Sequence, residues 1–297
     1  MRILVTGARG QLGTDCLEVL SAHETRGLDL PDVDIADPSS VRAAFGAFRP
    51  DAVINCAAYT AVDRAESDEA AADRVNRAGP AVLAAACAAS GARLVHVSTD
   101  YVFSGDRPVP EAWDEEDAPA PRTAYGRTKL AGERAVAASG CDFVVLRTAW
   151  LYGAHGRNFP KTMLRLALKN PEDTARVVSD QWGCPTWSFR LAEQVRAVLE
   201  APAGRLSGIC HSVGQGWTNW FAFAEAFLER MGVPHRLTPC GTDEYPTPAH
   251  RPANSILDDR RLREAGLLVM DDWRAALNAF VDRHRDELLA EARASLG

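Results

Sequence analysis

The fold is decided by residues 2–13, which read RILVTGARGQLG. A short apolar run ends in a turn with glycines at positions 7, 10 and 13, and a helix-like stretch follows over residues 11–21. Glycines allow a tight turn and let backbone amides approach a pyrophosphate at the positive end of the helix. We therefore expect a dinucleotide site at Gly7, Gly10, Gln11, Leu12 and Gly13. A tight turn without a ligand is the alternative.

The alternation of apolar runs and helix-like segments continues through the first half of the chain. Apolar runs occur at residues 52–54, 94–97 and 143–146, and helix-like segments at 68–89 and 125–138. This rhythm predicts an α/β fold with a doubly wound parallel sheet of the Rossmann type, covered by helices on both faces. His96 lies within an apolar run and is expected in the core.

The rhythm changes after Trp150, where prolines and tryptophans become frequent and apolar runs shorten. We expect a dinucleotide-binding domain over residues 1–150 and a smaller C-terminal substrate lobe over residues 151–297. Segments near residues 188–212 are expected to return to the main sheet.

Composition limits the classes of function. The chain has 297 residues and a formal net charge of −7, which argues against general nucleic-acid binding. No apolar run approaches the roughly 18 to 20 residues that span a bilayer, and we expect no leader before the first strand. The seven cysteines are scattered and form no Cys-x-x-Cys pair, so neither a disulfide framework nor a zinc site is expected. We expect a cytoplasmic protein that contacts neither membrane nor nucleic acid.

Three further residues are expected to contact the dinucleotide. Asp29 ends the second expected strand, where a carboxylate can accept hydrogen bonds from an adenosine ribose. A turn-forming aspartate before Pro31 is the alternative. Ala57 and Ala58 follow the third apolar run, and small residues there let the backbone approach a cofactor closely.

Tyr125 and Lys129 are four residues apart in a helix-like segment, so both lie on one helix face. An ammonium beside a phenol lowers the pKa of the phenol, and such a phenol can exchange a proton with a substrate oxygen. Thr99 follows a strand at the edge where doubly wound sheets bind ligands, and its hydroxyl can polarise a carbonyl. A polar turn capped by Asp100 is the alternative there.

Several blocks together resemble extended short-chain dehydrogenase/reductases, and more narrowly the dTDP-4-dehydrorhamnose reductase family. They occur in family order over most of the chain: the glycine turn, Ser98-Thr99-Asp100-Tyr101-Val102-Phe103, Tyr125-Gly126-Arg127-Thr128-Lys129, Arg147-Thr148-Ala149-Trp150, Asn158-Phe159, Asp180-Gln181, and Arg251-Pro252-Ala253-Asn254-Ser255.

The resemblance implies a role for each matching residue. Tyr125 would protonate the C4 keto oxygen, Lys129 would hold the nicotinamide ribose, and Thr99, or less favourably Ser98, would polarise the carbonyl. NADPH or NADH would be the cofactor, and a dTDP-4-keto sugar the substrate. The resemblance leaves room for a homodimer, and no acidic cluster in the sequence demands a metal. The implied substrate-binding residues are Asp100, Tyr101, Trp150, Asn158, Arg251 and Asn254.

Three alternatives to a dTDP-4-dehydrorhamnose reductase stay open. The loop over residues 104–123 is rich in proline and acidic residues, and if it overhangs the sugar, another dTDP-4-keto-6-deoxyhexose would be the substrate. A non-catalytic regulatory relative would keep cofactor binding without turnover. An epimerase or dehydratase is less favoured because no glutamate follows Asp100.

Overall fold

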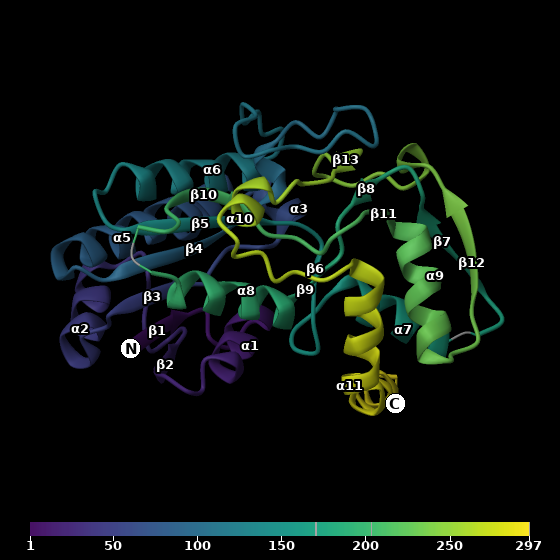
Figure 1. Cartoon of the computed structure of the whole chain (residues 1–297). Coiled ribbons are helices and arrows are strands. Elements are labelled where there is room, and N and C mark those ends of the chain that lie inside the picture. Colours follow the sequence, from purple (N-terminus) through teal and green to yellow (C-terminus); the bar gives the residue numbers. More distant parts are fainter. Residues whose placement is uncertain (170, 203, 297) are drawn as a thin grey trace.

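The computed structural model describes residues 1–169, 171–202 and 204–296. Its centre is a six-stranded parallel sheet in the order β10-β5-β4-β3-β1-β2 (Figure 1). The strands are β1 (Arg2–Thr6), β2 (Glu24–Leu28), β3 (Ala52–Asn55), β4 (Arg93–Thr99), β5 (Phe143–Thr148) and β10 (Gly208–His211). The inner strands are short apolar runs buried on both faces, as parallel sheets require.

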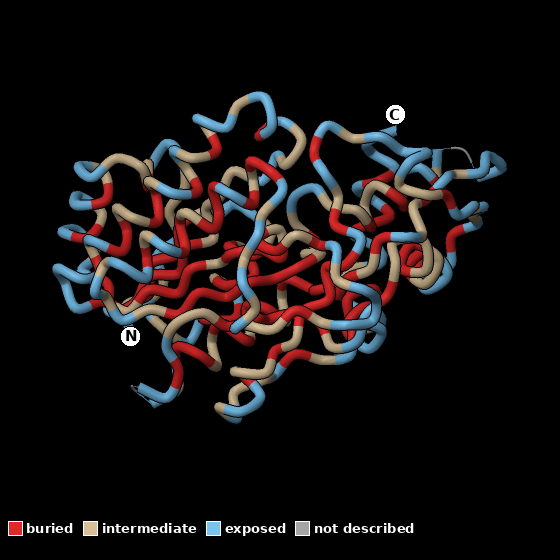
Figure 2. The backbone as a smooth tube through the Cα atoms, turned by 90° about the horizontal axis from the view of Figure 1, so that it is seen from above, coloured by how far each residue is buried: buried red, intermediate tan, exposed pale blue. Residues whose placement is uncertain are grey.

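Helices cover both faces of this sheet. Side chains of α1 (Gln11–Val19) and α8 (Ser188–Glu200) form one core layer with the strands. Side chains of α2 (Pro38–Phe48), α5 (Gly79–Ser90) and α6 (Ala124–Ala137) form the layer on the other face. Figure 2 shows that the buried backbone is concentrated along the strands between these layers. The expected doubly wound α/β fold is confirmed, and His96 is fully buried within it.

The sheet also takes in residues from the second half of the chain. β10 pairs with β5, and α8 packs on α1. The short helix α10 (Arg260–Glu264) lies against β10, where its Leu262 joins the same core layer. The strand β10 at this edge of the sheet, and the helices α8 and α10, therefore come from the part of the chain after residue 187.

The single helix expected over residues 68–89 is instead interrupted. Helices α3 (Val62–Ala65) and α4 (Glu69–Asp73) lead into a π-helical turn η1 (Arg74–Ala78), and α5 follows it. The turn carries Asn76, whose carbonyl oxygen would lie 2.1 Å from a Cβ at Gly132 of α6, so only a glycine fits there. The Asn76 side chain accepts a hydrogen bond from the Tyr59 backbone at 2.8 Å. The π turn thus fixes the loop that follows β3.

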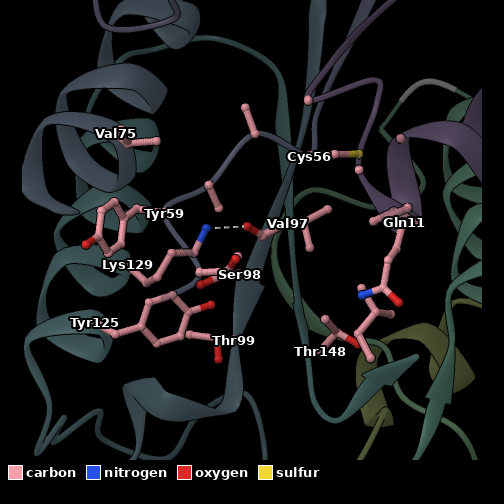
Figure 3. Close-up of a pocket in the computed structure, with 18 of the residues that line it drawn as sticks. Gln11, Cys56, Tyr59, Val75, Val97, Ser98, Thr99, Tyr125, Lys129 and Thr148 are labelled. Atoms are coloured by element: carbon pink, nitrogen blue, oxygen red, sulfur yellow. Dashed lines mark hydrogen bonds between the residues drawn. The ribbon is translucent and has the colours of Figure 1, made fainter. Parts of the chain in front are cut away.

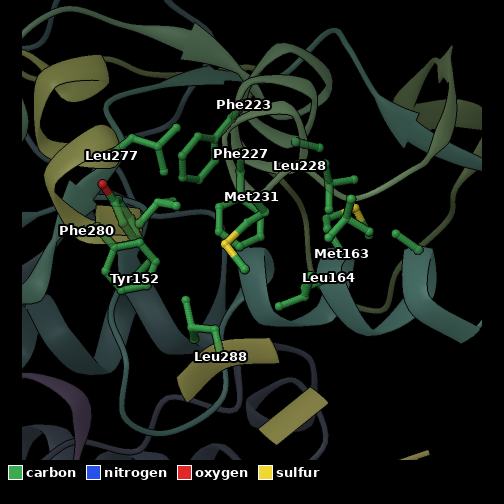
Figure 4. Close-up of a cluster of buried hydrophobic side chains, with 14 of the residues drawn as sticks. Tyr152, Met163, Leu164, Phe223, Phe227, Leu228, Met231, Leu277, Phe280 and Leu288 are labelled. Atoms are coloured by element: carbon green, nitrogen blue, oxygen red, sulfur yellow. The ribbon is translucent and has the colours of Figure 1, made fainter. Parts of the chain in front are cut away.

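The remaining residues form a smaller lobe around α7 (Phe159–Lys169), α9 (Trp220–Met231) and α11 (Trp273–Ala294). Aromatic side chains fill its core, among them Tyr152, Phe223, Phe227 and Phe280 (Figure 4). Short strands complete the lobe: β6 (Leu151–Tyr152) with β9 (Thr186–Trp187), β7 (Thr174–Val178) with β12 (Arg236–Cys240), and β8 (Trp182–Gly183) between β11 (Thr218–Asn219) and β13 (Asn254–Ser255). Within the described ranges, no helix is long and apolar enough to cross a membrane.

Candidate active site

A cavity of about 850 Å³ opens at the carboxyl ends of the central strands and extends toward the smaller lobe (Figure 3). Doubly wound sheets bind their ligands at this edge. Of the residues expected to act in catalysis or to bind a cofactor or substrate, these line it: Gly7, Gly10, Gln11, Leu12, Gly13, Asp29, Ala57, Ala58, Thr99, Asp100, Tyr101, Tyr125, Lys129 and Trp150.

The glycine turn is shaped by close backbone contacts. Gly7 has φ +68°, and a Cβ there would lie 2.5 Å from the Ala57 nitrogen. A Cβ at Gly13 would lie 2.2 Å from the Gly7 oxygen, so neither position accepts a side chain. A Cβ at Gly10 would have only the Gly7 oxygen within 4 Å, at 3.3 Å. Gly10 is the N-cap of α1, and no side chain caps the helix there. The first amides of α1 are therefore not covered by a side chain where they meet the cavity.

Asn55 explains why Ala57 comes so close to this turn. Its side-chain oxygen accepts hydrogen bonds from Thr6 at 2.8 Å and from the Ala57 nitrogen at 3.2 Å. Its amide nitrogen is 3.0 Å from His96 Nδ1. This buried side chain therefore connects the ends of β1 and β3 with the middle of β4.

Asp29 immediately follows β2 and faces the cavity beside the glycine turn. Its carboxylate accepts hydrogen bonds from the backbone nitrogens of Arg9 at 3.0 Å and Leu30 at 2.9 Å. The Arg9 side chain bends away to the Leu30 carbonyl at 3.0 Å and to Asp32 at 3.2 Å. The turn role and a ribose contact are thus compatible, because two amides orient the carboxylate at the rim of the cavity.

Tyr125 and Lys129 lie on the buried face of α6, which Thr123 caps by accepting a hydrogen bond from the Gly126 nitrogen at 3.0 Å. Lys129 Nζ donates to the Val97 carbonyl of β4 at 2.6 Å (Figure 3). The Tyr125 ring stands edge-on to Tyr101, with centroids 5.5 Å apart. The spacing of four residues places both side chains in one cavity.

The expected lowering of the Tyr125 pKa is wrong for this arrangement. Burial raises the pKa of the Tyr125 phenol, and the nearby Thr99 hydroxyl opposes that rise only in part. The Lys129 ammonium points at a carbonyl of β4 instead of stabilising a phenolate. Burial also lowers the pKa of Lys129 to about 8, although Glu133 favours the charged form. The loss of hydration on burial thus lowers the pKa of Lys129 more than the charge of Glu133 raises it.

Thr99 is the last residue of β4 and connects several polar groups. Its hydroxyl donates to Asp100 Oδ1 at 3.1 Å and accepts from the Tyr101 nitrogen at 3.2 Å. The neighbouring Ser98 hydroxyl is buried and has no hydrogen-bond partner among the described residues. Both hydroxyls line the cavity, and Ser98 is the one not yet engaged.

Trp150 follows β5 with φ +48°, a backbone conformation that bulky side chains rarely adopt. Its ring stacks on Trp220 with centroids 3.5 Å apart, and a Cβ at Gly183 would lie 2.5 Å from it. The Trp150 ring is thus held between Trp220 of α9 and Gly183 of β8 at the cavity wall. Such local strain is common at functional sites.

Three expected substrate-binding residues do not line the cavity. Asn254 is 1% exposed, and its amide donates to the carbonyls of Arg107, Pro108 and Glu111, the closest at 2.8 Å. Its hydrogen bonds are used inside the protein, so this arrangement does not support a direct substrate contact, which stays a prediction.

Asn158 and Arg251 each contact a residue that does line the cavity. Asn158 donates to Gln11 Oε1 at 2.8 Å and therefore fixes a residue of the glycine turn. Arg251 is ion-paired with Asp63 at 2.5 Å and donates to the Tyr101 hydroxyl at 3.1 Å. The structure thus places both beside the cavity, one residue removed from its surface.

The loop over residues 104–123 packs away from the cavity. Trp113 of this loop pairs with residues 256–258, stacks on Phe103 with centroids 4.8 Å apart, and donates to the Asn254 carbonyl at 3.2 Å. None of the loop's residues lines the cavity. The structure therefore gives no support to the condition under which this loop would select a different sugar.

The sequence reasoning missed several cavity residues. Thr148 is paired in register with Thr99, and its buried hydroxyl has no partner in the described part of the chain. Thr148 ends β5 just as Thr99 ends β4, so its position at the end of a strand could have indicated a cavity residue. Tyr59 and Arg157 come from irregular loops, where no periodicity indicates orientation. Arg74, which is ion-paired with Asp34, lies on the unexpected π turn.

A parallel sheet, a glycine turn and a hydroxyl, phenol and ammonium in one cavity define the class of short-chain dehydrogenase/reductases. Residues 1–286 match the family described as the RmlD substrate binding domain. The dTDP-4-dehydrorhamnose reductase of Burkholderia thailandensis is 41% identical over 95% of this chain and 98% of its own. The chain belongs to the dTDP-4-dehydrorhamnose reductase family.

Two further relatives bear on cofactor and substrate. The dTDP-4-dehydrorhamnose reductase of Bacillus anthracis, solved in complex with NADP, is 37% identical and superimposes with a TM-score of 0.90, over 95% of this chain and 99% of its own. A probable dTDP-4,6-dihydroxy-2-methyloxan-3-one 4-ketoreductase of Streptomyces antibioticus is 43% identical over 95% of each chain.

Proposed function

We propose that the protein reduces the C4 ketone of a dTDP-4-dehydro-6-deoxy sugar, converting dTDP-4-dehydro-L-rhamnose to dTDP-L-rhamnose with NADPH or NADH. The observation that carries this proposal is that Tyr125, Thr99 and Lys129 face one cavity with the glycine turn. The family membership supports the choice of substrate, since the Burkholderia relative has this name.

The cavity fits a nicotinamide dinucleotide. Gly10 leaves the start of α1 open to a pyrophosphate, and Asp29 lies where a ribose hydroxyl would donate. Gln11, Leu12, Ala57 and Ala58 would contact the dinucleotide, and Lys129 would reach the nicotinamide ribose. When bound, the reduced cofactor supplies the hydride to C4.

Tyr125 supplies the proton in this proposal. The raised pKa keeps the phenol protonated over the ordinary pH range, so it is ready as an acid when negative charge develops on the C4 oxygen. Thr99 or the unengaged hydroxyl of Ser98 donates a hydrogen bond to the same oxygen. Asp100, Tyr101 and Trp150 line the wall against which the sugar would lie.

A related dTDP-4-keto-6-deoxyhexose is the second candidate substrate. The Streptomyces antibioticus relative is named for a different ketoreductase, although its identity to this chain is comparable with that of the Burkholderia reductase. The loop over residues 104–123 gives no support to a different sugar, because it does not line the cavity.

We also propose a division into a dinucleotide-binding domain over residues 1–150 and a substrate lobe over residues 151–297, with the segment near residues 188–212 returning to the sheet. A cytoplasmic location is supported by the free cysteines, five of which are buried thiols. A homodimer rests on the sequence resemblance alone, and light scattering of the purified protein tests it.

Turnover of purified protein tests the function. The protein is incubated with dTDP-4-dehydro-L-rhamnose or dTDP-4-keto-6-deoxy-D-glucose and with NADPH or NADH, and the product stereochemistry is determined by NMR. We expect dTDP-L-rhamnose and oxidised cofactor in equal amounts. Binding of the cofactor without turnover of either sugar would support the non-catalytic alternative.

A further inference from the structure

We propose that the Thr148 hydroxyl binds the carboxamide of the nicotinamide ring and orients the ring for hydride transfer. This inference rests on the proposed function, because it assumes a nicotinamide dinucleotide in the cavity. It assigns a contact to a residue that neither the glycine turn nor the groups around the C4 ketone account for.

Thr148 has a buried hydroxyl that no described residue satisfies. The residue is 7% exposed and lines the cavity, yet its Oγ1 atom has no hydrogen-bond partner among the residues that the structure describes. Buried polar groups of native proteins nearly always have a partner, because losing hydration without a replacement is unfavourable. This hydroxyl is therefore available to a ligand that enters the cavity.

Thr148 and the proton donor belong to different faces of the sheet. Leu146, two residues earlier on β5, lies in the core layer of α1 and α8, and alternate residues of a strand point to the same face. Tyr125 and Lys129 come from α6, which covers the other face. Figure 3 accordingly shows Thr148 across the cavity from both side chains. Thr148 is thus placed to hold the cofactor, and not the sugar oxygen that Tyr125 would protonate.

The order of the strands places the nicotinamide end of the dinucleotide beside β5. Asp29, which would bind the adenosine ribose, follows β2, and the glycine turn follows β1, the next strand of the sheet. Lys129, which would reach the nicotinamide ribose, donates to the Val97 carbonyl of β4. Thr148 ends β5, the strand after β4, where it is paired with Thr99. Adjacent strands are about 4.8 Å apart, so Thr148 lies within reach of a ring attached to that ribose.

The carboxamide is the group on the nicotinamide ring that matches a hydroxyl. Its oxygen accepts and its nitrogen donates hydrogen bonds, and a threonine hydroxyl can do both. The same hydrogen bond would fix the rotation of the ring, and with it the face of the ring that points toward the substrate. Thr148 is thus a cofactor-binding residue whose contact sets the orientation of the ring.

Thr148→Val tests this contact, because valine keeps the shape of the side chain and removes the hydroxyl. In calorimetric titrations the dissociation constant for NADH should rise about tenfold, since the carboxamide loses its partner. ADP-ribose is the matched probe, because it is NADH without the nicotinamide, and its affinity should stay within about twofold. The variant should unfold at the same urea concentration as the wild type or at a higher one, because the hydroxyl makes no hydrogen bond within the described part of the protein. NADPH and 2′-phospho-ADP-ribose provide the same comparison.

Thr148→Ser is the conservative control, because it keeps the hydroxyl and loses only a methyl group. It should bind NADH within about threefold of the wild-type affinity. The proposal would be overturned by unchanged NADH binding in Thr148→Val, by equal weakening of NADH and ADP-ribose, or by equal weakening of NADH in both variants. A wild-type protein that binds NADH but reduces no dTDP-4-keto sugar would contradict the proposed function alone, and the titrations would still decide whether Thr148 contacts the ring.

Discussion

The glycine turn and the segment over residues 251–255 were both expected to bind ligands, yet the structure uses them differently. Every residue expected at the turn faces the cavity. In the other segment, Asn254 is buried against the loop over residues 104–123, and Arg251 is ion-paired with Asp63. The turn presents its backbone to the cavity, whereas residues 251–255 support groups that line it.

The difference lies in what fixes each side chain. A turn between a buried strand and a helix is positioned by local geometry, because strand end, glycines and helix start leave few conformations. A side chain in a loop is oriented by whatever packs against it from distant parts of the chain. Motif matches of equal quality therefore deserve different interpretations, depending on whether they adjoin the central sheet.

Tyr125→Phe is expected to have the largest effect, although Tyr125 lies on α6 and only shares the cavity with the glycine turn. The ring and its packing remain, but the hydroxyl that would protonate the C4 oxygen is lost. We expect kcat to fall by roughly two to four orders of magnitude, while cofactor affinity barely changes. Steady-state kinetics and cofactor titration by fluorescence measure both quantities.

Tyr101→Phe is the matched control, since its ring stands against Tyr125 and its hydroxyl accepts from Arg251. It should retain at least about a tenth of the wild-type turnover. If Tyr125→Phe also kept more than a tenth, its assignment as the proton donor would be wrong.

Asn254→Ala addresses the supporting role found for the second region. The amide holds three backbone carbonyls of the loop over residues 104–123 and accepts from the Ile256 nitrogen at 2.8 Å. Losing these buried hydrogen bonds should lower the free energy of unfolding by about 2 to 3 kcal/mol. Urea denaturation measures this loss, and the KM for the dTDP-sugar of the folded protein should stay within about twofold. A large rise in KM with unchanged stability would restore the direct substrate contact.

Much of the central fold could be predicted because it follows from local patterns. The apolar runs predicted β1, β3, β4 and β5, and the helix over residues 125–138 differs from α6 by one residue at each end. The π turn could not be predicted, because it depends on the contact of Asn76 with Gly132 on another helix. The pKa direction of Tyr125 was also missed, since burial in the folded protein decides it.

Arg251→Ala separates two ways in which the second region can affect the substrate. The guanidinium can act through a diphosphate contact or by positioning Tyr101. In either case its loss should raise the KM for the dTDP-sugar by about tenfold or more, because charged hydrogen bonds contribute about 1.5 to 3 kcal/mol. Asp63→Ala removes the partner of the ion pair and keeps Arg251. Because the Asp63 side chain is 43% exposed, the pair itself contributes little, and KM should change less than about threefold. Equal effects of the two variants on stability, with unchanged dTDP binding by calorimetry, would make Arg251 purely structural.

Asp29→Ala tests the edge of the glycine turn, where the expected effect is smallest. The carboxylate is oriented by two backbone nitrogens and lies at the rim of the cavity. It would accept a hydrogen bond from the 2′-hydroxyl of NADH and repel the 2′-phosphate of NADPH, so we expect the wild type to accept both cofactors. The variant should shift the ratio of kcat/KM values toward NADPH by about tenfold, equivalent to about 1.4 kcal/mol. Asp32→Ala is the control, because that carboxylate is also close to Arg9 but does not line the cavity, and it should leave the ratio within about twofold. An unchanged ratio in Asp29→Ala would mean that the carboxylate only stabilises the turn and does not contact the cofactor. A well-positioned residue beside the glycine turn would then not be evidence of a ligand contact.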